Sequence, residues 1–353
     1  MKQYGNTVYL NDGLDNATFC DTKIVLLTGD KDAPVKFYDF IEAEAIDDIE
    51  FNETESEEYV RATEDVEIRI APSDSVEVLG SLNAGDIIVR DATSDSGWSR
   101  VYNDEYGTGY VHTDKIELVP MTDTYGMCGT NIVWEYNKET RELILTGTGE
   151  MNGYEKEGYG WDKQRGNIKK ITISKGITSI GYNAFCNCDL LTDIIIPESV
   201  TSIEPYAFYE CTSLASITIP STVTILGEYA FWDCNSLTSI TIPNSVTVIG
   251  DWAFAYCESL TSVTIPDSVT TISESAFYYC NSLTDITIPD SVTTIGERAF
   301  EECTSLTSVT IPDSVTTIGN SAFYSCISLN EVYITDISAW CNIDLKNKDS
   351  NPL

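Results

Sequence analysis

Cysteine is the residue type whose spacing in this chain most directly suggests chemistry, because thiols can form disulfides, ligate metals or act as nucleophiles. Seven of the eleven cysteines recur every 23 residues: Cys188, Cys211, Cys234, Cys257, Cys280, Cys303 and Cys326. In a stack of repeats these side chains would run parallel, with Cβ atoms about 4.8 Å apart. That separation exceeds the usual disulfide range, and parallel thiols do not converge on a metal ion. We therefore expect seven free thiols that fill the core.

Residue arrangements typical of catalysis are not found in the sequence. The single histidine, His112, has no partner nucleophile in a recognisable motif. The many carboxylates fall in no motif that would exclude water or shift a pKa. Phosphate-binding loops, dinucleotide-binding glycines and paired zinc cysteines are also missing, and the pairing of the remaining cysteines stays open: Cys20, Cys128, Cys186 and Cys341. We predict a protein without enzymatic activity, cofactor or metal.

Large aromatic residues beside a recurring phenylalanine are the best candidates for ligand binding. They are Tyr206, Tyr209, Tyr229, Trp232, Trp252, Tyr256, Tyr278 and Tyr279. Variable aromatic positions on a rigid repeat are typical of a binding surface, and ring faces suit sugars. The alternative is an outer layer of rings packed over neighbouring coils. Joint exposure of Tyr229, Trp232 and Trp252 would favour binding, whereas their burial would favour a spacer.

These residues belong to a repeat that extends from residue 171 to residue 334. Phenylalanine returns at Phe185, Phe208, Phe231, Phe254, Phe277, Phe300 and Phe323, and a leucine and a proline keep the same period. Within one repeat, the alternation of Leu214–Ile219 predicts a half-buried strand that Pro220 ends. Gly227 indicates a corner, and Ala230–Phe231 a short helical turn. Stacked copies would bury continuous ladders of side chains, which predicts a β-rich solenoid.

The unit SLTSVTIPDSVTTIGxxAFxxC resembles the BspA-type leucine-rich repeat of bacterial surface proteins. The preceding segment is similar to the β-rich cap that opens the solenoid in this family, with the matching stretches Cys128–Gly129, Ile132–Trp134, Leu143–Gly149 and Ile168–Ile173. The resemblance implies a noncatalytic surface protein that binds a partner. It also implies an extracellular or cell-surface location. The sequence does not open on a secretory leader, and the resemblance favours a leader missing from this chain over an intracellular location.

A second resemblance lies within residues 57–120. Short alternating stretches separated by glycine turns predict a small β-barrel: residues 66–73, 78–82, 97–101 and 107–111. The pattern is similar to a bacterial SH3-like (SH3b) domain, although Ile70–Ala71 stands where the family often has Ser-Gly. The resemblance implies a shallow groove that binds peptidoglycan or a peptide. The candidate groove residues are Trp98, Tyr102, Tyr106 and Tyr110, with the barrel core as the alternative place for Trp98.

The predicted fold class is mainly β, with an SH3-like barrel followed by a leucine-rich-repeat solenoid that has short helical turns. Residues 1–56 read as an acidic N-terminal segment and linker whose role stays open, and residues 57–120 as the barrel. The β-rich cap is assigned to residues 121–170 and the repeats to residues 171–334. Residues 335–353, where ISAWCNIDL replaces the regular unit, are interpreted as an interrupted or truncated repeat.

The net charge of −36 limits the partners. Between Gly176 and Trp340 the one basic residue is Arg298, so nucleic acid and anionic membranes are unfavourable partners, and no apolar run is long enough to insert in a membrane. The acidity provides solubility, or it attracts a basic protein or a cation; a neutral glycan is also compatible.

We predict a surface adhesion protein whose solenoid binds a protein or glycan on host or neighbouring cells. The alternative is a cell-wall accessory protein in which the SH3b domain binds peptidoglycan or a peptide and the solenoid is a spacer. A subunit of a larger enzyme is a third interpretation. Co-sedimentation with peptidoglycan sacculi would separate the first two.

Overall fold

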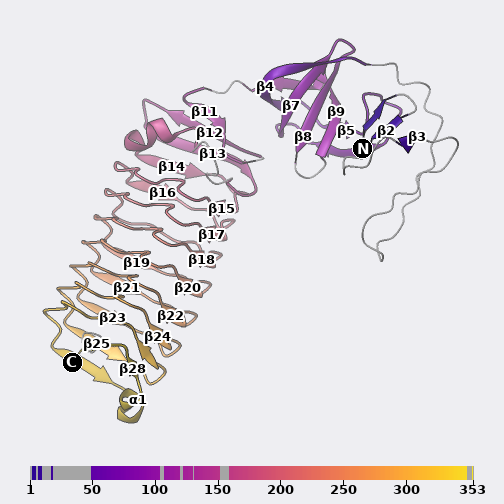
Figure 1. Cartoon of the computed structure of the whole chain (residues 1–353). Helices are drawn as coiled ribbons and strands as arrows, with labels where there is room; N and C mark the ends of the chain where they lie inside the picture. The colour runs from indigo at the N-terminus through magenta and orange to yellow at the C-terminus, as the bar shows by residue number, and fades with distance from the viewer. Residues whose placement is uncertain are drawn as a thin grey trace. The chain divides into compact units, whose positions relative to one another are not determined.

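The computed structural model describes residues 2–4, 7–9, 17–18, 49–103, 107–119, 122–129, 131–151, 159–347 and 352 (Figure 1). The chain divides into two compact units, Met1–Glu117 and Leu118–Leu353. Cys20 and Tyr106 lie outside the described residues, as does most of the segment 1–48. In the described part of the chain, no helix has the length and apolar character needed to cross a membrane.

The N-terminal unit is built from strands. A seven-stranded sheet has the order β10-β4-β7-β8-β9-β5-β6. Its strands are β4 (Phe51–Ala62), β5 (Val66–Arg69), β6 (Val78–Leu82), β7 (Ile87–Ser94), β8 (Trp98–Asn103), β9 (Gly107–His112) and β10 (Ile116–Leu118), with a 3-10 turn at Thr113–Lys115; a separate sheet comprises β1 (Lys2–Tyr4), β2 (Thr7–Tyr9) and β3 (Ala17–Thr18). Leu82 on β6 and Ile116 on β10 are buried in the same apolar cluster. The seven-stranded sheet therefore curls around one core, and the expected N-terminal β region is present.

Strand β4 begins earlier than the sequence suggested. Residues 51–56 were assigned to the acidic linker, but they form the first half of β4 and pair with β7 from Phe51↔Ser94 to Glu53↔Ala92. Asn52 and Glu53 are exposed, whereas Phe51 packs on Tyr110 and the Thr54 hydroxyl donates to the carbonyl of Asp91. An acidic composition does not report backbone pairing, so the sequence alone did not indicate a strand here.

The solenoid unit opens with a cap that changes strand direction. Its sheet has the order β11-β12-β13-β14-β16, formed by β11 (Tyr125–Met127), β12 (Asn131–Asn137), β13 (Glu142–Thr148), β14 (Lys170–Ile173) and β16 (Asp193–Ile195). The pairs β11–β12 and β12–β13 are antiparallel, whereas β13–β14 and β14–β16 are parallel. Trp134 and Trp161 are fully buried and contact each other at 5.8 Å between ring centroids, so their rings close the first coil.

Beyond the cap, each repeat contributes one coil with strands on two sides (Figure 1). One sheet contains β19 (Ser239–Thr241), β21 (Ser262–Thr264), β23 (Asp285–Thr287), β25 (Ser308–Ile311) and β27 (Glu331–Ile334). The other contains two-residue strands: β15 (Ser179–Ile180), β17 (Ser202–Ile203), β18 (Ile225–Leu226), β20 (Val248–Ile249), β22 (Thr271–Ile272), β24 (Thr294–Ile295), β26 (Thr317–Ile318) and β28 (Asp344–Leu345). Within each sheet, a residue pairs with the equivalent residue of the next repeat, as Ser239 does with Ser262. The predicted mainly β solenoid is confirmed, and the second sheet is an addition to it.

One predicted strand is missing. Leu214–Ile219 keeps the expected alternation, with Ile217 and Ile219 buried and Ser216 and Thr218 exposed, but it is not a strand. The ladder is thus interrupted between β16 and β19. Side-chain alternation reports which residues face the core, and it does not require that the backbone groups pair with the next coil.

The third side of each coil is a turn that carries the phenylalanine. Here the amide of Phe208 donates to the carbonyl of Ala230 in the next repeat, and the amide of Cys211 donates to the carbonyl of Phe208. The short helical turn expected at Ala230–Phe231 is present as a series of turns, each closed by a hydrogen bond from an amide to the carbonyl three residues earlier, and it is not a helix. Consecutive phenylalanine rings lie between 5.2 and 5.5 Å apart from Phe185 to Phe323. They form a buried ladder along the solenoid.

The last coil continues the sheets beyond the seventh phenylalanine. Residues 335–353 were expected to be an interrupted repeat, yet β28 pairs with β26 at Thr317↔Asp344. Between β27 and β28 the chain inserts the short helix α1 (Ile337–Cys341), whose N-terminus is capped by Asp336 through a 2.8 Å bond from the amide of Ala339. Trp340 packs against the core, so the insertion covers part of the last coil.

Candidate ligand-binding surface

The phenylalanine-bearing turns place aromatic side chains in columns on one side of the solenoid. In one column Tyr206 stacks on Tyr229 with ring centroids 4.8 Å apart, and Tyr229 stacks on Trp252 at 5.9 Å. In the second column Tyr209 stacks on Trp232 at 4.5 Å. These columns arise because each side chain has an equivalent 23 residues later in the next coil.

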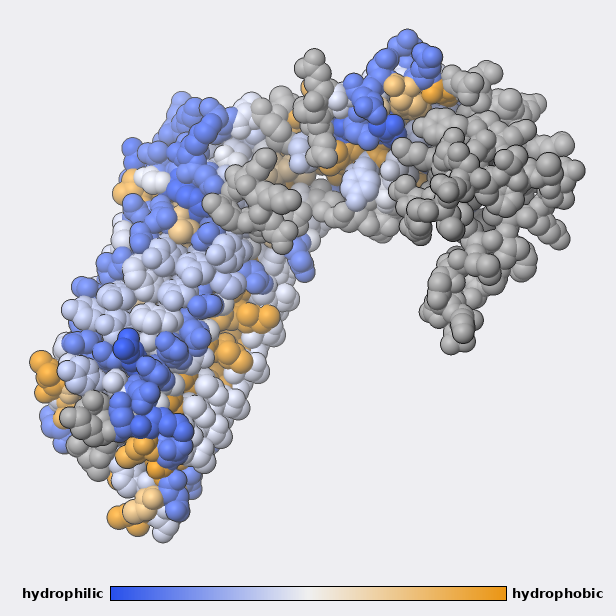
Figure 2. Space-filling model, in the orientation of Figure 1, coloured by the Kyte–Doolittle hydropathy of each residue, from blue (hydrophilic) through white to orange (hydrophobic). Residues whose placement is uncertain are grey.

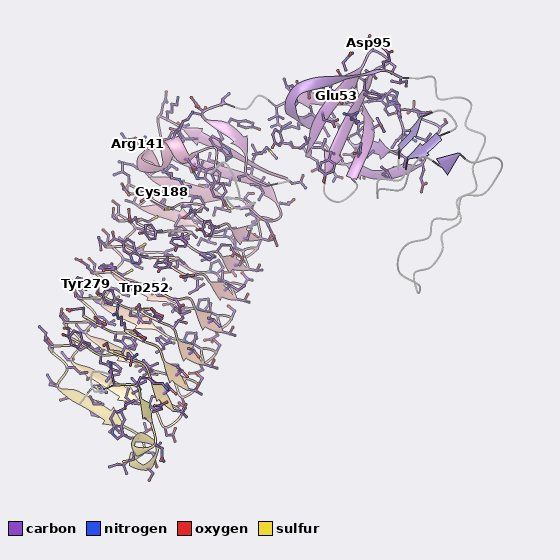
Figure 3. The ribbon with its side chains drawn as sticks, viewed as in Figure 1. Glu53, Asp95, Arg141, Cys188, Trp252 and Tyr279 are labelled. Atoms are coloured by element: carbon purple, nitrogen blue, oxygen red, sulfur yellow. The ribbon has the colours of Figure 1, made fainter. Side chains whose placement is uncertain are left out.

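The two columns form one surface. Tyr206 contacts Tyr209 at 5.6 Å at one end, and Trp252 contacts Tyr278 at 5.5 Å at the other. The connected residues, which we name the aromatic strip, are Tyr182, Tyr206, Tyr209, Tyr229, Trp232, Trp252, Tyr256, Tyr278 and Tyr279. Trp252 and Tyr279 are labelled in Figure 3. The structure therefore brings together all eight solenoid residues that the sequence singled out.

The exposure of the aromatic strip lies between the two outcomes that the sequence posed. Tyr229, Trp232 and Trp252 are each half-buried, as are the other members except the more exposed Tyr182. Each ring stacks on a neighbour and leaves part of its surface to solvent. Figure 2 shows a solenoid surface that is hydrophilic or neutral over much of the visible face, with hydrophobic side chains in small separate groups. The aromatic strip is accordingly both an outer packing layer and an accessible surface.

The backbone of the turn does not favour aromatic residues. Tyr206, Tyr229 and Trp252 adopt left-handed conformations, with φ of 60°, 56° and 59°. This conformation costs an L-residue about 1–2 kcal/mol, and asparagine adopts it more readily than a bulky residue. The first repeat has Asn183 at the equivalent position, also with a positive φ. The rings of the later repeats must therefore be explained by what their faces contact.

Carboxylates border the aromatic strip on both sides. On one side stand Glu228, Asp251 and Glu274, which occupy equivalent positions in successive repeats, and all three are exposed. Burial raises the pKa of Tyr229 most strongly, and the charges of Glu228, Glu274 and Asp251 raise it further. The three carboxylates therefore interact electrostatically with this ring.

The other border is lined by Glu210, Asp233 and Glu258. Burial raises the pKa of Asp233 most strongly, and the charges of Glu210 and Glu258 raise it further. Burial, followed by the charge and hydrogen bond of Glu210, raises the pKa of Tyr209 to about 12. Sequence reasoning missed these borders as a unit, although the acidic residues Glu228, Asp251 and Glu274 at equivalent positions were a signal that could have revealed the first border. Tyr182 was missed because it stands one position before the variable site.

The periodic cysteines are structural. Six of the seven thiols, from Cys211 to Cys326, donate to the carbonyl oxygen of the phenylalanine in the preceding repeat, as from Cys257 Sγ to Phe231 O at 3.2 Å. Burial raises the pKa of the Cys188 thiol to about 12, which suppresses the reactive thiolate. All seven are free, as are the buried Cys128, the half-buried Cys186 and the exposed Cys341. Among the described residues, no group of three or more His, Cys, Asp or Glu side chains could hold a metal ion.

In the N-terminal unit, the outer face of β8 and β9 collects three of the four candidate groove residues. Cross-strand pairs place Trp98 beside His112 and Tyr110 beside Arg100, with Tyr102 farther along β8 on the same face. Trp98 is only 6% exposed, but it lies outside the apolar core cluster. It is covered by the imidazole of His112, whose centroid is 3.9 Å away. This burial is what the core alternative anticipated, and the covering contact comes from His112.

The other groove candidates differ in exposure. Tyr102 is 48% exposed, and Tyr110 is half-buried beneath the ring of Phe51 at 5.3 Å. Tyr106 lies outside the described residues. Among the described candidates, Tyr102 is therefore the one exposed ring on this face.

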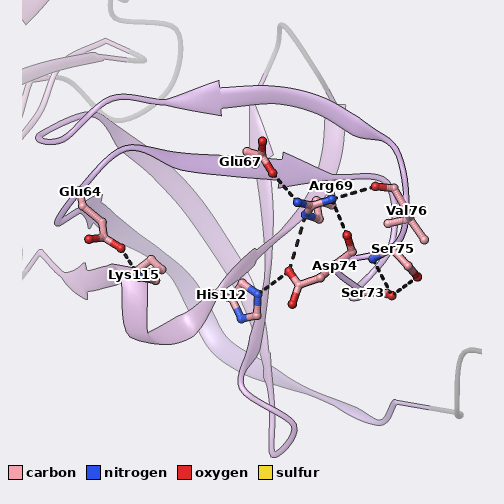
Figure 4. Close-up of polar contacts among 9 residues, drawn as sticks. All are labelled: Glu64, Glu67, Arg69, Ser73, Asp74, Ser75, Val76, His112 and Lys115. Carbon is pink, nitrogen blue, oxygen red and sulfur yellow. Dashed lines mark hydrogen bonds and ion pairs between the residues drawn. The ribbon is translucent and has the colours of Figure 1, made fainter.

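A polar cluster holds His112 in place (Figure 4). His112 Nε2 and Asp74 Oδ1 are 2.9 Å apart, and the guanidinium of Arg69 lies 3.8 Å from the same carboxylate oxygen. Arg69 also donates to the carbonyls of Asp74 and Val76, and pairs with Glu67. The hydrogen bond from His112 lowers the pKa of Asp74. The cluster fixes the loop between β5 and β6.

Comparison with known proteins agrees with a repeat protein of the leucine-rich-repeat class. Residues 163–284 and 270–342 match the BspA type Leucine rich repeat region, in six copies. Because these ranges together span more than half of the chain, the protein belongs to this family.

Solved structures of leucine-rich-repeat proteins resemble parts of the chain. A protein from Bacteroides ovatus ATCC 8483 is 25% identical over 61% of this chain and 76% of its own, with a TM-score of 0.38. The Treponema protein described as T. pallidum Leucine Rich Repeat protein is 23% identical over 49% and 86%, with a TM-score of 0.39. A leucine rich cell surface protein from Faecalibacterium prausnitzii A2-165 is 20% identical over 64% and 98%, with a TM-score of 0.36. No curated protein matches the chain.

Proposed function

We propose that the protein is a noncatalytic adhesion protein of a bacterial cell surface, and that its aromatic strip recognises a protein or glycan partner. The observation that carries this proposal is the continuous network of half-exposed rings from Tyr182 to Tyr279. Several of these rings occupy backbone positions where asparagine would be less strained. A repeated, rigid display of aromatic faces is well suited to recognition, because aromatic residues supply much of the binding energy at interfaces.

The substitution Trp252→Ser tests this proposal without a large change in backbone demand. Serine already occupies the equivalent position in the next repeat at Ser275, also with a positive φ. Thr264→Ala, on the exposed face of β21, is the matched control. The full-length chain and both variants would be applied to arrays of extracellular-matrix proteins and glycans.

We expect the wild type and Thr264→Ala to bind the same array component, and Trp252→Ser to bind it at least tenfold more weakly. Unchanged binding by Trp252→Ser, with loss in Thr264→Ala, would place recognition on the sheet and refute the proposal. Absence of binding by the wild type to every component would also count against it. Thermal melts of the three proteins would show whether the substitutions leave the fold intact.

A second candidate function is supported by the N-terminal unit, which resembles an SH3b domain in sequence. The outer face of β8 and β9 carries the exposed Tyr102 together with Trp98 and Tyr110. In this proposal the face binds peptidoglycan or a peptide, and the solenoid is a spacer. Co-sedimentation of the full-length chain with peptidoglycan sacculi, compared with Tyr102→Ala, distinguishes the two functions. Pelleting that depends on Tyr102 and is insensitive to Trp252→Ser would favour the wall-binding function.

A further inference from the structure

We infer that the partner of the aromatic strip is a polypeptide segment rich in lysine or arginine, lying along the solenoid axis. This inference rests on the proposed function and adds the chemical class of the partner. It follows from the combination of ring faces with two acidic borders, and from the lack of cations within the repeats to neutralise those borders.

The first border runs in register with the rings. Glu228, Asp251 and Glu274 stand at equivalent positions of three successive coils. Asp251 and Glu274 are adjacent, because the amide of Glu274 donates to Asp251 Oδ1 at 3.1 Å. The charges of all three act on the phenol of Tyr229. A ligand over this ring would therefore meet carboxylates from three coils.

The second border has like charges close together. The pKa of Asp233 is raised by its burial and by the neighbouring Glu210 and Glu258. A carboxylate in this position is easier to protonate than usual, because its burial and the like charges beside it disfavour the charged form. A bound ammonium or guanidinium group would remove this penalty.

The repeats themselves offer almost no such group. From Gly176 to Trp340 the only lysine or arginine is Arg298. Arg298 occupies the position equivalent to Trp252 and contacts Glu301 Oε2 at 3.5 Å and Glu297 Oε1 at 3.8 Å. It lies beyond the last ring of the strip. Arg298 thus shows within this chain how a guanidinium is held between the carboxylates of the turn.

Ring faces and carboxylates together discriminate among partner classes. A lysine or arginine side chain gains from both, because cations are attracted to the faces of tryptophan and tyrosine as well as to carboxylates. A neutral sugar can stack on the rings and donate hydroxyl hydrogen bonds to the carboxylates, but it leaves their negative charge without a counterion. Nucleic acid is repelled by the charge of the solenoid. A basic polypeptide is therefore the partner that uses every feature of this surface.

The test uses fluorescein-labelled octaarginine as the probe, with octaglutamate as the peptide control and an N-acetylglucosamine hexamer as the neutral glycan. Fluorescence anisotropy would measure peptide binding to the full-length chain at low and physiological salt. Two triple variants carry the same loss of charge. The strip variant is Glu228→Gln, Asp251→Asn and Glu274→Gln, and the corner variant is Asp267→Asn, Asp290→Asn and Asp313→Asn.

The corner variant is a matched control because its three residues are also exposed and repeat in register, but they follow the proline between the two sheets. We expect octaarginine to bind the wild type, and the strip variant and Trp252→Ser to weaken binding at least tenfold. The corner variant should weaken it less than threefold. Octaglutamate should not bind.

Equal weakening by the two triple variants would overturn the inference, because it would indicate attraction to overall charge. A second result would overturn it and leave the proposed function intact: no octaarginine binding, but binding of the hexasaccharide that depends on Trp252. Failure of both probes, together with no Trp252-dependent binding on the arrays, would contradict the inference and the proposed function.

Discussion

At the scale of single residues, the core of the solenoid depends on a contact between cysteine and phenylalanine. From Cys211 to Cys326, each periodic thiol donates to the phenylalanine carbonyl of the preceding repeat. The same carbonyl accepts an amide hydrogen bond within its own repeat, as Phe231 does from Cys234. The sequence predicted small, buried, unpaired thiols. It did not predict their acceptors, because the distance between a thiol and a carbonyl one coil away depends on how the turn is folded.

The reactivity of the thiols follows from this burial. We expect Ellman's reagent at pH 8 to react with Cys341 in the native chain and to leave the seven periodic thiols unmodified. Burial raises the pKa of thiols such as Cys188 and Cys326 to about 12 and excludes the reagent. Denaturation without a reductant should release at least those seven. Fewer than seven additional thiols would indicate disulfides within the ladder and contradict the structure.

The phenylalanine ladder predicts how much stability is lost when one of its rings is removed. Phe254 is fully buried between Phe231 and Phe277, with ring centroids 5.3 and 5.5 Å away. We expect Phe254→Ala to lower the free energy of unfolding by about 3–5 kcal/mol. Chemical denaturation followed by circular dichroism would measure this, with Thr264→Ala as the surface control. A loss below about 1 kcal/mol would show that the ring is not part of a packed core.

At the scale of elements, most coils consist of two strands and a turn that contains two left-handed residues, and the coil with Leu214–Ile219 lacks the longer strand. The sequence predicted the longer strand, the proline that ends it and the turn. The second strand was missed because two residues are too few to show a period, as with Ile225–Leu226. The left-handed residues were missed because tyrosine and tryptophan are not residues that signal this conformation, as at Tyr229 and Trp252.

Left-handed positions without an aromatic ring allow the backbone preference to be tested separately. Ser325 has a φ of 61° and lies in the last such turn. We expect Ser325→Asn to preserve or slightly raise the melting temperature, and Ser325→Val to lower stability by about 1–2 kcal/mol, because a β-branched residue resists this conformation. The two thermal melts provide the measurement. A valine variant as stable as the asparagine variant would contradict the assigned turn geometry.

At the scale of the whole molecule, a net charge of −36 opposes the compact state through self-repulsion. The repeats were readable from the sequence because one unit recurs seven times, so each structural position is seen repeatedly. The N-terminal unit has no such redundancy, and the start of β4 was misplaced there. The aromatic strip could be predicted because the residues at its positions differ from repeat to repeat. Its acidic borders became apparent only in the stacked coils of the structure.

Mild acid should stabilise the solenoid. Burial raises the folded-state pKa of Asp233 and of Glu301 above their ordinary values. Protonation of these groups therefore favours the folded state, and the free energy of unfolding should rise as the pH falls from 7 toward 5. The opposite contribution comes from groups with a lowered pKa such as Asp74, and it is lost only at pH values near or below the ordinary value of 3.8.

Calorimetry at pH 7 and pH 5 would check this expectation. The double variant Asp233→Asn and Glu301→Gln should show a smaller gain in melting temperature than the wild type. A melting temperature that falls steadily between pH 7 and pH 5 would mean that paired carboxylates dominate over the repulsion.

The central claim is that recognition takes place on the aromatic strip. Hydroxyl-radical footprinting with mass spectrometry measures this directly, by comparing side-chain oxidation in the free chain and in its complex with the tightest-binding array component. We expect Trp232, Trp252 and Tyr256 to become protected from oxidation, while Tyr333 on β27 remains unchanged. Protection of Tyr333 or of the N-terminal Tyr102, with the three strip residues oxidised as in the free chain, would contradict the claim.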